Sequence, residues 1–220
     1  MGSRRMERDA MRVVVFDIGN VLLRWDPRNL YRKLFETSDR VEWFLSNVCD
    51  MPWNEAQDRG RSWADAVSER VARFPEWERE IRAYDNRWLE MLDGEISDNV
   101  DVLRRLKTAG TPVYAITNFS REKFAVARTE HGFLDCFDGI VVSGEVGLIK
   151  PDRQIFRHFL DRYGLAAADC VFIDDSRANT AAAAELGMST IHYVEPMDLA
   201  EALARLGIVL SEAPSLRRRS

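Results

Sequence analysis

Carboxylates follow two apolar runs that lie far apart in the chain. Asp17 follows the run 13–16, and the pair Asp174-Asp175 follows the run 170–173. Continuous apolar runs of this length are typical of parallel strands that are covered on both faces. In an open α/β sheet, ligands bind just beyond the carboxyl ends of the strands. We therefore expect Asp17 and Asp174 to meet at one edge of a sheet, where their oxygens can hold a divalent metal.

The metal that these residue types favour is Mg²⁺, which prefers oxygen ligands and takes one or two carboxylates with several waters. Adjacent carboxylates such as Asp174 and Asp175 repel each other and need a cation or a basic group nearby. Two plainer roles stay open. Asp17 can cap the turn at Gly19-Asn20, and Asp175 can stabilise the start of a helix that begins near Ser176.

A hydroxyl and an ammonium group follow two further runs. Thr117-Asn118 ends the predicted strand 113–117, and its hydroxyl and the following backbone N–H groups can cradle phosphate oxygens. Lys150 ends the β-like run 147–150, before Pro151, which suits the first turn of a helix. Beside carboxylates, this lysine would balance their charge and hold a phosphoryl oxygen. Taken alone, Thr117 and Asn118 also suit a helix cap, and Lys150 also suits a solvated surface.

Strands and helices alternate along most of the chain, which predicts βαβ units and a parallel sheet. A long segment, 25–94, interrupts this alternation with helical periodicity; Trp25 lies at its entrance, and the other five tryptophans follow within it. We expect a Rossmann-like core at 11–24 and 95–208, a helical insertion with its own aromatic core at 25–94, and flexible tails at 1–10 and 211–220. The predicted later elements are helices at about 97–107, 120–131, 152–163, 176–186 and 197–206, and strands at 139–143, 170–173 and 189–194.

Composition places the chain among ordinary globular enzymes. Its 220 residues carry a net charge of −5, which favours neither nucleic acid nor an anionic membrane as a partner. No apolar run is long enough to span a bilayer, and the charged N-terminus lacks the apolar stretch of a signal peptide. The three cysteines, Cys49, Cys136 and Cys170, are widely spaced and match neither a disulfide framework nor a zinc site. We expect a cytoplasmic protein, as a monomer or a homodimer.

Four segments, in this order, resemble the four motifs of the haloacid dehalogenase-like (HAD) hydrolase superfamily. They are Asp17-Ile18-Gly19-Asn20-Val21, Ile116-Thr117-Asn118, Lys150-Pro151-Asp152 and Ile173-Asp174-Asp175-Ser176. The insertion after the first segment resembles the helical cap of subfamily I. The resemblance implies Mg²⁺ and an aspartyl nucleophile at Asp17. It implies that Thr117 and Lys150 hold the phosphoryl group, with Gly19, Asn20 and Asn118 beside them, and that Asp17, the Gly19 carbonyl, Asp174 and Asp175 form the metal site.

One residue departs from the phosphatase pattern. Phosphatases of this family usually have a second aspartate, acting as general acid and base, where this chain has Gly19. Such proton transfer is worth roughly 10²–10⁴-fold in rate. Some sugar-phosphate phosphatases of the family resemble this chain in having a D-x-G-N-V first motif. We therefore expect a Mg²⁺-dependent phosphatase that acts on a small phosphorylated metabolite, such as a sugar phosphate.

Two alternatives stay open. A 2-haloacid dehalogenase shares the aspartyl nucleophile, but that branch usually has an aromatic residue at the position of Gly19 and a threonine at that of Val21. The second alternative is a catalytically weak protein that binds phosphate esters or a partner, which Gly19 favours.

Overall fold

A five-stranded parallel sheet organises the protein. The computed structural model describes residues 12–212, and the sheet has the order β5-β4-β1-β6-β7, with every neighbouring pair parallel. Its strands are β1 (Val13–Phe16), β4 (Val113–Thr117), β5 (Gly139–Val142), β6 (Cys170–Asp174) and β7 (Ser189–His192). Because the strands run the same way, their carboxyl ends share one edge, which agrees with the predicted α/β class.

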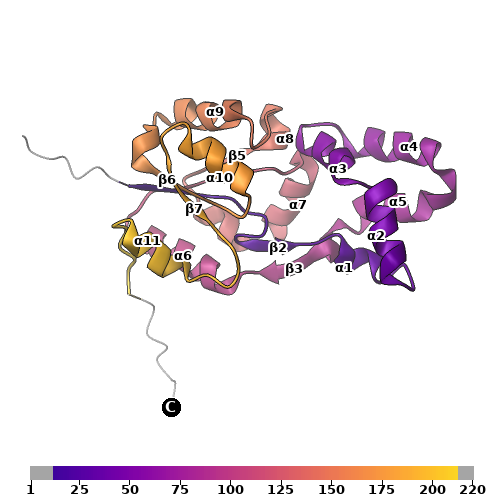
Figure 1. Ribbon diagram of the computed structural model, residues 1–220, viewed down its shortest axis with the longest axis horizontal. Coiled ribbons are helices and arrows are strands. Elements are labelled where there is room, and N and C mark those ends of the chain that lie inside the picture. The colour runs from indigo at the N-terminus through magenta and orange to yellow at the C-terminus, as the bar shows by residue number, and fades with distance from the viewer. Residues whose placement is uncertain (1–11, 213–220) are drawn as a thin grey trace, which may run out of the picture.

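Helices cover both faces of the sheet, on opposite sides of the strands in Figure 1. Side chains of a strand alternate between its faces, so Val13 and Val15 pack with one set of helices, and Val14 and Phe16 with the other. The first set is α9 (Arg153–Tyr163) and α10 (Arg177–Ala184). The second is α6 (Ser97–Thr108), α7 (Arg121–Glu130) and α11 (Leu199–Arg205). This double cover explains why β1 is apolar throughout and β6 is apolar up to its last residue, Asp174.

A group of helices lies at one end of the sheet, at the right of Figure 1. They are α1 (Arg28–Tyr31), α2 (Ser38–Asn47), α3 (Met51–Asp58), α4 (Trp63–Arg73) and α5 (Glu78–Asn86), with 3-10 turns η1 (Pro75–Trp77) and η2 (Trp88–Met91). The antiparallel strands β2 (Leu23–Trp25) and β3 (Leu92–Glu95) link this group to the rest. Trp53, Trp63 and Tyr84 contact one another through their rings. The same buried cluster continues to Val14 and Phe16 of the sheet, so this aromatic core is not separate.

Several predicted boundaries need correction. The run 147–150 is not a strand: Gly147 has left-handed backbone (φ 71°) and ends the short helix α8 (Ser143–Val146), after which the chain continues as a loop. Ser211, placed in a predicted tail, exchanges two hydrogen bonds with Arg105. The other tail residues lie outside the described part of the chain, except Glu212. The strands β2 and β3 were not predicted.

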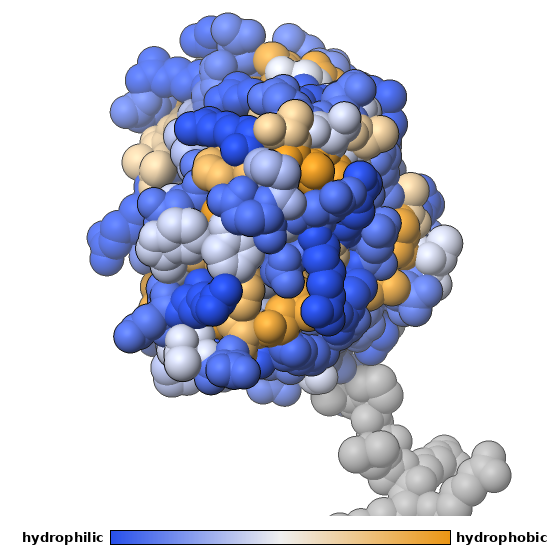
Figure 2. All heavy atoms as spheres, turned by 90° about the vertical axis from the view of Figure 1, so that its right-hand side faces the viewer, coloured by the Kyte–Doolittle hydropathy of each residue, from blue (hydrophilic) through white to orange (hydrophobic). Residues whose placement is uncertain are grey.

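The outer end of the helical group is mostly hydrophilic. Figure 2 looks onto this end and shows apolar spots scattered between charged and polar side chains. The large aromatic residues Trp53, Trp63 and Tyr84 are buried beneath it. Among residues 12–212, no helix combines the length and the apolar character that crossing a membrane requires.

Candidate active site at the carboxyl edge of the sheet

Four strands deliver polar side chains to the same edge of the sheet. Asp17 follows β1, Thr117 is the last residue of β4, Ser143 follows β5, and Asp174 is the last residue of β6. Asp17 is anchored by its own backbone N–H, which donates to the carbonyl of Ile173 at 2.7 Å. Parallel pairing of β1 with both β4 and β6 therefore brings together residues that are more than 150 positions apart in the sequence.

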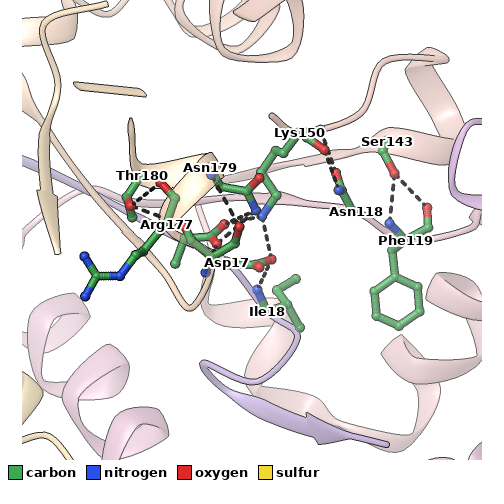
Figure 3. Close-up of polar contacts among 11 residues, drawn as sticks. Asp17, Ile18, Asn118, Phe119, Ser143, Lys150, Arg177, Asn179 and Thr180 are labelled. Atoms are coloured by element: carbon green, nitrogen blue, oxygen red, sulfur yellow. Dashed lines mark hydrogen bonds and ion pairs between the residues drawn. The ribbon is translucent and has the colours of Figure 1, made fainter. Parts of the chain in front are cut away.

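Lys150 lies between the two carboxylates (Figure 3). Its Nζ is 2.9 Å from Asp17 Oδ1 and 2.7 Å from Asp174 Oδ2. The Asn118 side chain fixes the loop that carries Lys150: its amide donates to the Lys150 carbonyl at 2.9 Å and accepts the Lys150 backbone N–H at 2.8 Å. Lys150 and Asp174 are fully buried at their side chains, so the three charges form an ion triad shielded from water.

Asn179 is a member of this site that the sequence reasoning missed. Its Nδ2 donates to both carboxylate oxygens of Asp174, at 2.9 and 3.1 Å, and the Ser176 backbone N–H donates to Oδ1 at 2.8 Å. Ser176 also caps α10. These donors hold the Asp174 carboxylate in one orientation. The available signal was an asparagine in the first turn of the helix that follows the two aspartates.

Burial dominates the electrostatics of Asp17. It raises the pKa of this carboxyl from 3.8 to about 7; the nearby Lys150 ammonium opposes the shift, and the negative charge of Asp174 adds to it. Burial also works against the Lys150 ammonium, but the carboxylates of Asp17 and Asp174 outweigh that effect and raise its pKa. Lys150 is therefore a fixed positive charge, whereas Asp17 needs additional positive charge nearby to stay ionised at neutral pH.

The oxygens of Asp17, Asp174 and Asp175 can face a common centre. One carboxylate oxygen from each lies within 4.8 Å of the others. Asp17 and Asp174 are buried, and Asp175 is exposed. An all-oxygen donor set with one solvent-facing side fits Mg²⁺, which keeps part of its water shell. Three carboxylates beside a single lysine also leave excess negative charge that a divalent cation would neutralise.

Thr117 contributes an orphaned hydroxyl. Its Oγ1 is buried and has no hydrogen-bond partner among residues 12–212. A buried hydroxyl without a partner costs about 1–3 kcal/mol, so its presence calls for an explanation. A bound oxyanion at the edge of the sheet would supply the missing partner.

A cavity of about 230 Å³ opens between this edge and the helical group. It is lined from the sheet side by Asp17, Gly19, Asn20, Asn118, Phe119, Ser120, Lys123 and Asp175, and from the helical segment by Trp25, Met51, Asn54, Glu55, Asp58, Trp63 and Trp88. Asn20 has left-handed backbone (φ 53°) and accepts the Trp25 N–H at 3.0 Å, so it shapes the turn. Sequence reasoning did not single out Asn54, Asp58 or Lys123.

Contacts between the two sides close the back of the cavity. Trp63 Nε1 donates to Ser120 Oγ at 2.9 Å, and Lys123 Nζ donates to the Asp85 carbonyl at 2.9 Å and pairs with its carboxylate. Four arginines of the helical segment or its entrance, Arg24, Arg28, Arg59 and Arg61, do not line the cavity. Arg24 forms an ion pair with Glu195, and Arg28 forms an ion pair with Glu42.

Comparison with known proteins agrees with this arrangement. The family model of the haloacid dehalogenase-like hydrolases matches residues 11–187. Among curated proteins, the sesquiterpene phosphatase astK of Aspergillus oryzae is 28% identical over 187 residues, which is 84% of this chain and 91% of that protein. The drimenol cyclase drtB of Aspergillus calidoustus is 27% identical over 186 residues, but the chain spans only 34% of its length.

Solved structures show the same fold. A HAD family enzyme of Bacteroides thetaiotaomicron has a TM-score of 0.70 at 20% identity, covering 88% of this chain and 98% of that one. Its complex with magnesium and inorganic phosphate has a TM-score of 0.67 at 21% identity, covering 87% and 98%. The motifs, the parallel sheet with its helical insertion and the family match agree, and the chain belongs to the haloacid dehalogenase-like hydrolase family.

Proposed function

We propose that this protein is a Mg²⁺-dependent phosphomonoesterase that acts on a small phosphorylated metabolite. The observation that carries the proposal is the position of Lys150 Nζ, within 2.9 Å of both Asp17 and Asp174, at the edge where the Thr117 hydroxyl has no partner. Lys150 and Thr117 do not line the cavity itself, but a phosphoryl group held at this edge of the sheet, beside Asp17, would receive a charged donor and a hydroxyl donor. The similarity to a sesquiterpene phosphatase supports this choice of reaction.

The chemistry divides among a few residues. Asp17 attacks phosphorus in line and forms an aspartyl-phosphate, which water hydrolyses in a second step. Lys150 and Thr117 hold the phosphoryl oxygens and stabilise the charge that grows on them. Asp17, Asp174, Asp175 and the Gly19 carbonyl would hold Mg²⁺. When bound, Mg²⁺ supplies positive charge to the phosphoryl oxygens and keeps Asp17 ionised.

The helical segment 25–94 acts in this proposal as a cap that selects the leaving group and excludes water. Its contribution to the cavity is strongly aromatic, with Trp25, Trp63 and Trp88 facing Phe119 of the core. Such a wall favours a leaving group with an apolar face, which a sugar ring and an isoprenoid chain both offer. The similarity to a sesquiterpene phosphatase supports an isoprenoid phosphate as the substrate, and the D-x-G-N-V motif supports a sugar phosphate.

Two observations bear on the alternatives. The haloacid dehalogenase branch is disfavoured by Gly19 and Val21, and by the cluster of three carboxylates, which suits a cation. The catalytically weak binder is favoured by Gly19 alone. The Bacteroides structure, which shares the fold of this chain, is a complex with magnesium and inorganic phosphate, and this supports a site that binds both groups.

Hydrolysis of p-nitrophenyl phosphate with Mg²⁺ and with EDTA tests the proposal. We expect EDTA to abolish turnover. We expect Asp17→Asn to abolish turnover as well, while its circular dichroism spectrum shows that the fold is intact. The matched control is Asp39→Asn, an exposed aspartate on α2. Phosphate binding without turnover would favour the binder, and release of chloride from 2-chloropropionate in EDTA would favour the dehalogenase. A panel of sugar and isoprenoid phosphates then identifies the substrate class.

A further inference from the structure

The position of the usual general acid is open in this protein. A Cβ placed on Gly19 would meet no atom within 4 Å, and Gly19 is not among the residues with positive φ. The backbone therefore does not require glycine here, and the missing side chain leaves free space beside Asp17. An ester whose leaving group is an unactivated alcohol still needs a proton on the departing oxygen. That proton has to come from another group on the cavity wall.

Asp58 is an acidic side chain on the opposite wall. It is the last residue of α3 and lines the same cavity as Asp17 and Gly19. Buried partners orient it: Asn54 Nδ2 donates to Asp58 Oδ2 at 3.1 Å, and Tyr84 Oη donates to Asn54 Oδ1 at 3.2 Å. Because the Asn54 oxygen is occupied by Tyr84, its amide group is directed to Asp58. The hydrogen bonds from Tyr84 to Asn54 and from Asn54 to Asp58 thus position a carboxyl group in the lining of a cavity that Asp17 also lines.

We propose that Asp58 is the catalytic acid and base of this enzyme, supplied by the cap in place of the side chain missing at Gly19. The assignment rests on the proposed phosphatase function. In the first step, Asp17 Oδ forms a bond to phosphorus, the bond from phosphorus to the ester oxygen breaks, and that oxygen takes the proton of the Asp58 carboxyl, giving an alcohol. In the second step, the Asp58 carboxylate takes a proton from water while the water oxygen attacks phosphorus. The bond to Asp17 breaks, and phosphate leaves.

The surroundings of Asp58 suit both roles. Burial raises its pKa from 3.8 to about 7; the charge of Glu55, one turn earlier on α3, adds to the shift, and the backbone N–H of Ser120 opposes it. Lys123 of α7, which pairs with Asp85 of α5, lines the cavity from the sheet side as a cation, and Asp17 and Asp175 line it as anions. A group that titrates near neutral pH is present in both protonation states, as an acid that later acts as a base requires.

Two substrates separate this role from a structural one. In p-nitrophenyl phosphate the phenolate leaves without a proton, whereas in 2-phenylethyl phosphate the alcohol needs one. For Asp58→Asn we expect kcat/KM to fall at least about 100-fold on the alkyl ester and less than about tenfold on the aryl ester. With the aryl ester, this variant should release one equivalent of p-nitrophenol per site in a burst before slow turnover, because hydrolysis of the aspartyl-phosphate has lost its base.

A second substitution supplies a rescue. Because the space at Gly19 is open, Gly19→Asp in the Asp58→Asn background should recover at least about tenfold of the lost kcat/KM on the alkyl ester. Asp39→Asn serves as the control for the charge change. Equal losses on both esters, or no loss on either, would overturn the role of Asp58 and leave the phosphatase intact. A wild type that hydrolyses only the aryl ester would also overturn the role of Asp58, because no proton is delivered to an alkyl leaving group. A wild type that hydrolyses neither ester refutes the proposed function itself.

Discussion

Asn118 and Lys150 exchange two hydrogen bonds through a single side chain. The Asn118 amide donates to the Lys150 carbonyl and accepts from the Lys150 backbone N–H, at 2.9 and 2.8 Å. These bonds connect the end of β4 to a loop 32 residues later. From this loop the buried Lys150 ammonium group reaches the carboxylates of both Asp17 and Asp174.

Asn118→Ala removes both bonds and frees the loop. We expect kcat/KM on p-nitrophenyl phosphate to fall by about 10²-fold, since small displacements of a positioning group have effects of this size. Unfolding in urea should show a loss of about 1–3 kcal/mol, because two buried backbone groups lose their partner. Asn47→Ala, which changes an exposed asparagine of α2, is the matched control. Unchanged kinetics in Asn118→Ala would show that the loop is held by other contacts.

Lys150→Met leaves two buried carboxylates without their cation. The free energy of unfolding at neutral pH in EDTA should fall by about 3–5 kcal/mol, as it does when one partner of a buried ion pair is removed. Mg²⁺ should restore part of this loss, because a divalent ion between Asp17 and Asp174 replaces the missing charge. Lys33→Met, at an exposed ion pair with Glu90, should cost less than about 1 kcal/mol. A variant as stable as the wild type in EDTA would contradict the electrostatic role of Lys150.

The raised pKa of Asp17 makes stability depend on pH. The folded protein binds this proton up to about pH 7, whereas the unfolded chain releases it near 3.8. The stabilisation from the bound proton is therefore complete below about pH 4 and is lost as the pH rises through about 7. In EDTA, Asp17→Asn should match the wild type at pH 4 and exceed it by about 2–4 kcal/mol at pH 8.

Urea unfolding from pH 4 to pH 8 measures this difference. Lys150 keeps Asp174 as a partner in the Asp17→Asn variant, so the substitution does not strand a buried ammonium. Parallel curves for the wild type and Asp17→Asn would mean that Asp17 keeps an ordinary pKa in the folded protein. Added Mg²⁺ should flatten the pH dependence of the wild type, because a cation favours the ionised carboxylate.

Asp175→Asn tests the exposed member of the carboxylate cluster. We expect the Mg²⁺ concentration for half-maximal turnover to rise by about 10–100-fold with the fold unchanged, as for other supporting groups of metal sites. The measurement is a Mg²⁺ titration of p-nitrophenyl phosphate hydrolysis. Asp169→Asn, near the other end of β6, is the control. An unaltered Mg²⁺ titration would mean that Asp175 does not support the metal site and serves only to stabilise the start of α10.

Ser120→Ala tests how the cap segment is joined to the core. Ser120 Oγ caps α7 and accepts the buried indole N–H of Trp63, so the substitution removes a cap and orphans a donor. Together these should cost about 2–3 kcal/mol in urea unfolding. Ser62→Ala removes only the cap of α4 and should cost about 1 kcal/mol. Similar losses in the two variants would show that the Trp63 contact adds little.

The sequence alone predicted the parallel sheet and the acidic residues at the carboxyl ends of two of its strands, β1 and β6. Continuous apolar runs at β1 and β6 are typical of strands covered on both faces, and parallel strands end at one edge, so Asp17 and Asp174 were expected to meet there. Thr117 and Lys150 were identified in a different way, because the order of the four motifs along the chain resembles that of a known family. The β-ribbon of Leu23–Trp25 and Leu92–Glu95 was not predicted, because its two short strands are stabilised by each other and lack an apolar pattern of their own.

Only the tertiary structure decided which groups share a cavity. The run 147–150 looked extended, yet Lys150 reaches the carboxylates from a loop held by Asn118. Nothing in the spacing of Asn179 or Asp58 relates them to Asp174 or Asp17, because those relationships depend on how α10 follows β6 and how α3 folds back over the sheet. The ionisation of Asp17 was undetermined for the same reason: burial and neighbouring charge are properties of the packed molecule, and a sequence contains only the groups that will experience them.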